Sequence, residues 1–168
     1  MKLNYVIFAG TSTLVLAVDQ VTKSYISRSM DLYSSIAVVE NFFNITYLRN
    51  RGAAFGLFGN SSFRLPFFIL IALAALVCIL CMLRNLTDQQ KFTTIGLSLI
   101  FSGALGNLVD RVRLGEVTDF LDVYWRSHHW PAFNIADSAL CVGVVLVLLG
   151  NINSEKVRES NKTMNIAV

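Results

Sequence analysis

Four long apolar runs dominate the pattern of hydrophobic and polar positions along the chain. They cover residues 3–21, 65–83, 92–109 and 135–152, so each holds 18 or 19 residues. A helix of that length measures roughly 27–29 Å, which matches a hydrocarbon core of about 30 Å. The pattern therefore predicts an all-α membrane protein, a bundle of four transmembrane helices.

Two long polar segments separate these runs, and both fall on one side of the membrane when the chain crosses it four times. Within the first, residues 22–64, the stretches 36–39 and 42–48 are rich in β-branched and aromatic residues. Because such a composition favours strands, we expect a small β-sheet cradle on the membrane surface, between the first two helices. The second segment, residues 110–134, is expected to be a polar loop.

The composition agrees with a membrane protein of one domain. The 168 residues are 54% hydrophobic and 15% charged, whereas a soluble domain is nearer 25% charged. The net charge of +3 fits contact with anionic membrane lipids and gives no reason to expect a nucleic-acid partner. Lys2 and the apolar run after it resemble a signal peptide, but the sequence lacks a clear cleavage site before Asp19. We therefore expect a retained first helix.

The distribution of basic residues leaves the orientation in the membrane open. Lysine and arginine number six on the side of the chain ends and eight on the side of the long segments, but the first side is much shorter. Count and density therefore point in opposite directions, and the positive-inside rule assigns neither side to the cytoplasm.

Small residues repeat along one stripe of the third run. Ser98, Ser102 and Gly106 are spaced by four residues, and Gly103 lies beside them. Such a stripe lets a neighbouring helix approach closely. The sequence therefore predicts that another helix packs tightly against this run.

The three cysteines lie inside apolar runs, where Cys78 and Cys81 form a C-x-x-C pair. In a soluble protein this pair indicates redox or zinc chemistry, but here neither a histidine nor an acid lies nearby in the sequence. We interpret Cys78, Cys81 and Cys141 as small apolar fillers. We expect neither a metal nor a cofactor.

Polar side chains gather at those ends of the runs that face the two long segments. Asp137 is the only charge in the run 135–152, and a carboxylate costs roughly 2.5–3.5 kcal/mol at a bilayer centre. An acid in such a place is a candidate functional residue, and we expect Asp119 to be its partner. The candidates at this face are Asp19, Lys23, Asn50, Asn107, Asp110, Arg111, Asp119, Asp122, Asn134 and Asp137.

Structural interpretations compete with the functional one at the helix ends. Asp19 and Lys23 have the i, i+4 spacing of a helical ion pair. Asn134 and Asp137 have the spacing of an N-cap and an acid in the first helical turn. Both sets could therefore serve only to stabilise helices.

The remaining candidates are open to similar interpretations. Asn107 and Arg111 share one helix face and could bind loop carbonyls instead of a substrate. Asp119 and Asp122 are three residues apart in a polar segment, where acids are often simply solvated. From the residues alone, Asp122 could also take the place of Asp119 in a pair with Asp137.

Five motifs follow one another along most of the chain. They are Asp19-Gln20-Val21-Thr22-Lys23, Arg49-Asn50-Arg51-Gly52-Ala53-Ala54-Phe55, Gly103-Ala104-Leu105-Gly106-Asn107-Leu108-Val109-Asp110-Arg111, Val117-Thr118-Asp119-Phe120 and Phe133-Asn134-Ile135-Ala136-Asp137-Ser138. In this order and at this spacing, they resemble the bacterial lipoprotein signal peptidases, also called signal peptidase II. Thr118 stands where the family often has valine, and the tail after Asn153 shows no such match.

This resemblance implies a four-helix membrane aspartyl endopeptidase, with Asp119 and Asp137 as its catalytic pair and an extracytoplasmic sheet. The residues implied to line and support the site are Asp19, Lys23, Asn50, Gly52, Asn107, Asp110, Arg111 and Asn134. The implied substrate is a prolipoprotein whose cysteine carries diacylglycerol, cut just before that cysteine. The implied location is the bacterial cytoplasmic (inner) membrane, with the active site at the outer face. Both chain ends, including the tail 153–168, would then be cytoplasmic, and nothing in the sequence demands more than a monomer.

Two alternatives come from other functional classes. A small proton-coupled transporter also combines four short helices with membrane carboxylates, but it needs an acid near the midplane and short loops on both sides. A structural membrane subunit would use the same polar residues only as caps and ion pairs. The clustering of acids at one face and the two long segments favour the peptidase, in which one carboxylate of a pair keeps a proton and the other activates water.

Overall fold

Four helices and four strands make up the part of the chain that the computed structural model describes, residues 3–52 and 63–166, with side chains of the last helix described as far as residue 151. The helices are α1 (Leu3–Ser29), α2 (Arg64–Arg84), α3 (Lys91–Leu114) and α4 (Ile135–Ile166). The strands are β1 (Ser35–Val39), β2 (Phe43–Asn50), β3 (Val117–Trp125) and β4 (His128–His129). Residues 53–55 of the second motif lie outside the described residues.

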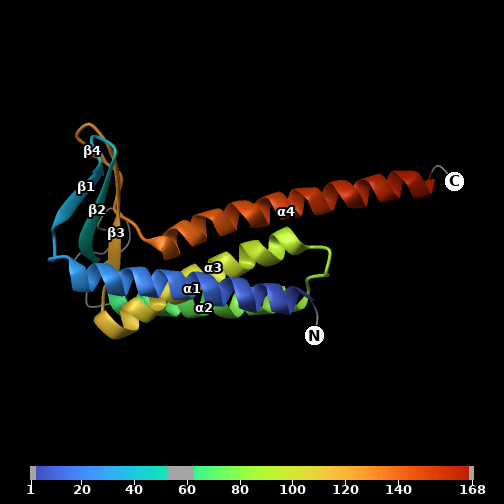
Figure 1. Cartoon of the computed structure of the whole chain (residues 1–168). Helices are drawn as coiled ribbons and strands as arrows, with labels where there is room; N and C mark the ends of the chain where they lie inside the picture. The colour runs from blue at the N-terminus through green and yellow to red at the C-terminus, as the bar shows by residue number, and fades with distance from the viewer. Residues whose placement is uncertain (1–2, 53–62, 167–168) are drawn as a thin grey trace.

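All four predicted runs form helices, and each helix is longer than its run, α2 by only one residue at either end. By length and composition α1, α2 and α3 can each cross a membrane, whereas the apolar helix Ile135–Asn151 within α4 is shorter. The helices α1 and α3 continue past the apolar runs, so several polar candidates lie on helices and not in loops. The backbone of the segment predicted as a tail continues α4 to Ile166. Figure 1 shows the beginning of α1 and the end of α4 at the end of the bundle opposite the sheet.

The helix α3 is the centre of the bundle, since it packs against each of the other three helices. Its predicted stripe of small residues is buried against α1, where Ser12 Oγ donates a hydrogen bond to the carbonyl oxygen of Ser98. Gly103, beside that stripe, instead faces α4: a Cβ there would overlap the carbonyl oxygen of Ala136. The prediction of close helix packing is therefore confirmed, and it applies to two neighbouring helices.

We expect Gly103→Ala to destabilise the protein and Gly10→Ala to leave it as stable or slightly more stable. The added methyl group at position 103 must displace α4, and overpacking of this kind costs about 1–3 kcal/mol. Gly10 lies on α1 with nothing within 4 Å of an added Cβ, so alanine there gains only helix propensity, up to about 1 kcal/mol. Thermal melts of both variants in the same detergent measure the difference, and equal melting temperatures would contradict the close packing.

The sheet stands at one end of the helix bundle (Figure 1). It is antiparallel, with the strand order β1-β2-β3-β4. The two predicted strands match β1 and β2, but the expectation of a polar loop over residues 110–134 is wrong, because β3 and β4 come from that segment. The cradle is therefore built from both long segments and not only from the one between the first two helices.

A glycine makes the transition from α3 to β3 possible. Gly115 ends the helix with a φ of 72°, and its N–H donates a hydrogen bond to the carbonyl oxygen of Arg111 at 3.0 Å. This left-handed conformation suits glycine far better than other residues. It turns the chain directly into β3, which pairs with β2 along residues that include Asp119 opposite Leu48.

Candidate active site

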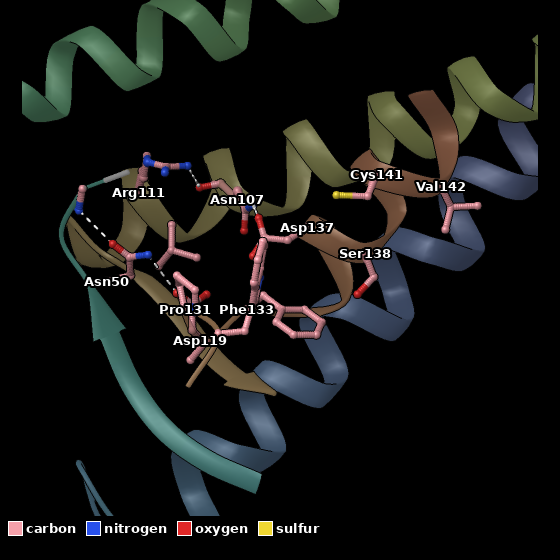
Figure 2. A pocket seen from close by; sticks show the side chains of 14 residues that line it. Asn50, Asn107, Arg111, Asp119, Pro131, Phe133, Asp137, Ser138, Cys141 and Val142 are labelled. Carbon is pink, nitrogen blue, oxygen red and sulfur yellow. Dashed lines mark hydrogen bonds between the residues drawn. The ribbon is translucent and has the colours of Figure 1, made fainter. Parts of the chain in front are cut away.

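A cavity of about 570 Å³ lies where β3, the C-terminal part of α3 and the beginning of α4 meet. Asp119 and Asp137 both line it, together with Asn50, Asn107 and Arg111. Figure 2 shows these side chains around the cavity, although they come from four different elements of the fold. The structure therefore brings together the two aspartates that the sequence analysis paired.

Asp119 is buried on β3, with only 3% of its surface exposed. Its Oδ2 accepts a hydrogen bond from Asn50 Nδ2 at 2.9 Å, and its Oδ1 accepts one from Asn134 Nδ2 at 2.8 Å. Burial raises the pKa of Asp119 to about 7, and the nearby Asp137 carboxylate also raises it, against the opposing effects of the two amides and Lys23. A carboxyl group with this pKa can hold a proton close to neutral pH.

Asp137 lies in the first turn of α4, where it takes part in a reciprocal cap. Its main-chain N–H donates to Asn134 Oδ1 at 3.0 Å, and its Oδ2 accepts from the Asn134 N–H at 3.1 Å. The predicted capping arrangement is thus present. The other oxygen, Oδ1, accepts a hydrogen bond from Asn107 Nδ2 at 2.8 Å. The side chain of Asp137 therefore caps α4 and lines the cavity at the same time.

Asn134 connects the two aspartates. Its side chain is fully buried, and besides Asp119 its Nδ2 group contacts Asn107 Oδ1 at 3.2 Å and the carbonyl oxygen of Thr118 at 3.3 Å. Because Asn107 in turn donates to Asp137, the two amides form a continuous hydrogen-bonded path between the carboxylates. The arrangement fixes both acids relative to each other.

Lys23 pairs with two buried acids that do not line the cavity, Asp19 and Asp110. Its Nζ lies 3.0 Å from Asp19 Oδ2 and 3.2 Å from Asp110 Oδ2, and all three side chains are at most 5% exposed. The predicted Asp19–Lys23 pair is therefore confirmed and extended by Asp110. These three residues do not contribute to the cavity lining. They support the site from outside.

Asp122, the other acid of β3, is directed away from the cavity. It lies three residues after Asp119, and side chains at such spacing on a strand point to opposite faces. Its Oδ2 accepts a hydrogen bond from Asn44 Nδ2 at 3.0 Å, and its Oδ1 lies 2.8 Å from His129 Nδ1. It does not line the cavity, so the structure does not bring Asp122 into a pair with Asp137.

Arg111 and Gly52 complete the set of predicted residues at the cavity. Arg111 Nη1 donates to the main-chain carbonyl of Asn107 at 3.3 Å, and its guanidinium lies over the ring of Phe68, 5.0 Å from the centroid. The N–H of Gly52 donates to Asn50 Oδ1 at 3.0 Å, which leaves the Asn50 NH₂ group to face Asp119. Gly52 therefore orients an amide that contacts Asp119, whereas Arg111 places its guanidinium at the cavity.

The sequence analysis missed the apolar part of the cavity. Its additional lining residues are Val117, Trp130, Pro131, Ala132, Phe133, Ser138, Cys141 and Val142. Cys141 follows Asp137 by one helical turn and is exposed, so it borders the cavity and does not fill the protein interior. Cys141 and Val142 follow Asp137 by four and five residues on the same predicted helix. This spacing was the signal in the sequence that could have placed them beside the cavity. Among the described residues, no group of three or more histidines, cysteines and acids is arranged to hold a metal ion.

Comparisons with known proteins agree on one family. Residues 11–153 match the family model described as signal peptidase (SPase) II. The lipoprotein signal peptidase of Geobacter metallireducens is 55% identical over 156 residues, which cover 93% of this chain and 96% of that protein. The lipoprotein signal peptidase of Geobacter sulfurreducens is 57% identical over 156 residues, or 93% and 98% of the two chains.

The fold agrees as well. A bacterial membrane enzyme solved by the in meso method at 2.3 Å resolution superposes with a TM-score of 0.78 and 35% identity, over 88% of each chain. A second such structure, at 1.9 Å resolution, gives a TM-score of 0.74 and 37% identity over 84% of this chain and 90% of that one. These matches exclude the transporter and the structural subunit as descriptions of this multi-pass membrane protein. The chain belongs to the lipoprotein signal peptidases, the bacterial membrane aspartic peptidases that cleave signal peptides from prolipoproteins.

Proposed function

We propose that Asp119 and Asp137 are the catalytic pair of this peptidase. The observation that carries the proposal is that these are the two carboxylates lining the cavity. Within the described part of the chain, neither forms a salt bridge, whereas Lys23 binds Asp19 and Asp110, and His129 binds Asp122. Their hydrogen-bond partners among side chains are neutral amides, so their proton is free to move during a reaction.

The proposed reaction is an addition of water followed by loss of the amine. The ionised carboxylate takes one proton from a water molecule as its oxygen bonds to the scissile carbonyl carbon, while the protonated carboxyl group donates its proton to the carbonyl oxygen. In the collapse of the tetrahedral intermediate, one hydroxyl returns its proton to the pair as the C=O bond re-forms. The C–N bond breaks, and the pair donates a proton to the departing nitrogen. The pair ends with one proton, as it began, and no covalent enzyme intermediate forms. The two acids titrate as a unit, so the shared proton belongs to the pair and not to one of the two residues.

The neighbouring side chains have positioning and binding roles in this proposal. Asn107 and Asn134 hold the aspartates, and Asn50 holds Asp119 from the β2 side. Arg111, whose guanidinium lies at the cavity, would bind a carbonyl oxygen of the substrate or a lipid phosphate, since arginine is well suited to both. Gly52 keeps Asn50 in the orientation in which it donates to Asp119.

The substrate we propose is a prolipoprotein whose cysteine already carries diacylglycerol, cut just before that cysteine. The support is the composition of the cavity lining, which combines acids and amides with the apolar residues Trp130, Phe133 and Val142. Val142 is 52% exposed on α4 and follows Asp137 within the apolar run, so acyl chains bound there could stay in the bilayer while water reaches the aspartates. Because one chain supplies all of these residues, we propose that the monomer, as a single domain of residues 1–168, is the active form.

We further propose that the sheet and the cavity lie at the outer face of the cytoplasmic membrane and that both chain ends are cytoplasmic. The support is geometric: α1 begins and α4 ends at the end of the bundle away from the sheet (Figure 1). A site at the outer face would receive exported prolipoproteins while their acyl chains remain in the outer leaflet.

A cleavage assay with the purified full-length chain tests the substrate assignment. We expect it to cut a prolipoprotein that carries diacylglycerol on its cysteine and to leave the same prolipoprotein without lipid uncut. The product of the cut, identified by mass spectrometry, should begin with the modified cysteine. Equal cleavage of both substrates would reject the requirement for lipid, and cleavage at another bond would reject the proposed cut site.

The pH dependence of cleavage tests the proton shared by the pair. Because burial raises the pKa of Asp119 to about 7, its proton is present below that pH and is lost above it. We therefore expect kcat/KM to fall about tenfold per pH unit on the alkaline side of roughly pH 7, where the pair loses its general acid. Asp122→Asn is the control, and it should show the same profile. A flat profile between pH 6 and 9, with the protein folded throughout, would contradict this assignment.

A further inference from the structure

Lys23 places a buried ammonium group beside the candidate pair but outside the cavity. An ammonium group has three protons to donate and accepts none, and Lys23 Nζ has three acceptors. These are Asp19 Oδ2 at 3.0 Å, Asp110 Oδ2 at 3.2 Å and Asn107 Oδ1 at 2.9 Å. Since Lys23 does not line the cavity, it can position the reacting groups only through these three acceptors, apart from its direct electrostatic effect on Asp119.

The two carboxylates bound to Lys23 hold main-chain amides at equivalent places. Asp19 Oδ1 accepts a hydrogen bond from the N–H of Ala136 at 3.0 Å. Asp110 Oδ2 accepts one from the N–H of Thr118 at 3.1 Å. Ala136 directly precedes Asp137, and Thr118 directly precedes Asp119. Thus one ammonium orients two carboxylates, and each carboxylate holds the N–H of the residue just before one member of the pair.

A close helix contact keeps this arrangement in place. A Cβ atom on Gly106 would lie 2.5 Å from Asp19 Oδ2, so only glycine leaves room at that position for the carboxylate to lie between α1 and α3. Asp19 itself is fully buried. We call Lys23, Asp19 and Asp110 the clamp.

Lys23 also determines which way round the Asn107 amide lies. Because the ammonium only donates hydrogen bonds, the Asn107 atom that faces it must be the oxygen, and the NH₂ group then faces Asp137 Oδ1 at 2.8 Å. Asn134 donates to the same oxygen at the longer distance of 3.2 Å. Without Lys23, an inverted amide would present its oxygen to the Asp137 carboxylate, and two acceptors repel each other.

We propose that Lys23 is a positioning residue, which sets the geometry of both aspartates through the clamp and the orientation of Asn107 without contacting the substrate. This inference rests on the catalytic pair proposed above. It assigns the charged lysine a role in the chemical step, beyond neutralising the two acids of the clamp.

The first test is Lys23→Met, which keeps most of the length of the side chain and removes the ammonium. We expect kcat to fall about 100-fold, the usual consequence of displacing catalytic groups by about 1 Å, while KM stays within about threefold of wild type because the cavity lining is unchanged. Lys23 lowers the pKa of Asp119, so the alkaline limb of the pH profile should move to higher pH. Wild-type kcat in folded Lys23→Met would overturn the proposal.

A double variant separates positioning from charge balance. In Lys23→Met with Asp110→Asn, the Asn oxygen can still accept from the Thr118 N–H, and one buried negative charge is removed together with the ammonium. We expect the melting temperature to recover toward wild type while kcat stays about 100-fold low, because the Asn107 amide is still not fixed. Recovery of kcat together with stability would show that Lys23 serves only to balance charge. If Lys23→Met alone does not fold, the double variant decides between these outcomes.

Gln20→Ala is the matched control. Gln20 Nε2 lies 3.1 Å from Asp19 Oδ2 and 3.2 Å from Asp110 Oδ1, so it contacts the same two acids, but in the described structure it makes no hydrogen bond to Asn107. We expect lower stability and a kcat within about threefold of wild type. Asp119→Asn and Asp137→Asn belong in the same assay: cleavage by either folded variant would reject the catalytic pair itself. If Asp119→Asn and Asp137→Asn are both inactive while Lys23→Met is fully active, only the role of Lys23 is rejected.

Discussion

Asp119→Asn and Asp137→Asn should each lower kcat by about 10⁴-fold, since either change removes a group that transfers a proton in the transition state. The amide has nearly the shape of the carboxyl group but cannot act as acid or base near neutral pH. Each aspartate accepts hydrogen bonds at both oxygens, and an asparagine can keep only one of them. A modest fall in melting temperature is therefore expected beside the large loss of activity. Single-turnover cleavage of the lipidated prolipoprotein measures the chemical step directly.

Asp122→Asn is the control for this pair of variants. Asp122 lies on the same strand as Asp119 and is also buried, at 9% exposure, but its partners are Asn44 and His129. We expect its activity to stay within about threefold of wild type, because the residue does not take part in proton transfer. A strong loss of activity in Asp122→Asn, or its retention in either of the other variants, would require a different pair of acids.

The second large effect is expected for Asn134→Asp, which should reduce kcat/KM by about 10²–10³-fold. Aspartate has the shape of asparagine but, when ionised, it only accepts hydrogen bonds. It therefore cannot donate to Asp119 Oδ1 or to Asn107 Oδ1, which Asn134 Nδ2 now contacts at 2.8 and 3.2 Å. It also places a third carboxyl group between the two aspartates. Kinetics and a thermal melt on the same preparation measure both consequences.

Asn44→Asp provides the matched change away from the cavity. Asn44 Nδ2 donates to Asp122 Oδ2 at 3.0 Å, so the variant places a carboxyl group against a buried aspartate as Asn134→Asp does. We expect the stability of Asn44→Asp to change in the same direction as that of Asn134→Asp. Its kcat/KM should stay within about threefold of wild type. If Asn44→Asp lost as much activity as Asn134→Asp, general destabilisation would explain both, and the role of Asn134 in aligning the pair would be rejected.

The helices were predictable from the sequence because their cause is local. A segment that crosses a membrane must satisfy its own backbone hydrogen bonds and present apolar side chains over about 20 residues. The run 65–83 therefore predicts α2, Arg64–Arg84, almost to the residue. Predicted ends were less accurate for α1 and α3, since both helices continue past the apolar runs through polar residues, Lys23 and Asp110, that pair inside the protein and not with water.

The strand β3 was not predictable in the same way. Its nine residues, Val117–Trp125, include Asp119 and Asp122, which fall on opposite faces and interrupt any regular alternation of apolar and polar positions. Both acids are buried because partners from other elements satisfy them. The signal that remained was the share of β-branched and aromatic residues at the other positions. Pairing with β2 then determined the strand.

The sequence by itself determined that this is a four-helix membrane protein, that Asn134 and Asp137 can cap a helix, and that Asp19 and Lys23 can pair. Each of these properties depends on spacing within one segment. Only the tertiary structure decided that Lys23 pairs with Asp19 and Asp110, and that Asp119 and Asp137 are the acids at the cavity. The contacts responsible join residues far apart in the chain, such as Asp19 and Ala136 at a separation of 117 positions. Hydrogen bonds of this kind exist only where the packing of α1, α3, β3 and α4 brings donor and acceptor within about 3 Å, and no local pattern records that geometry.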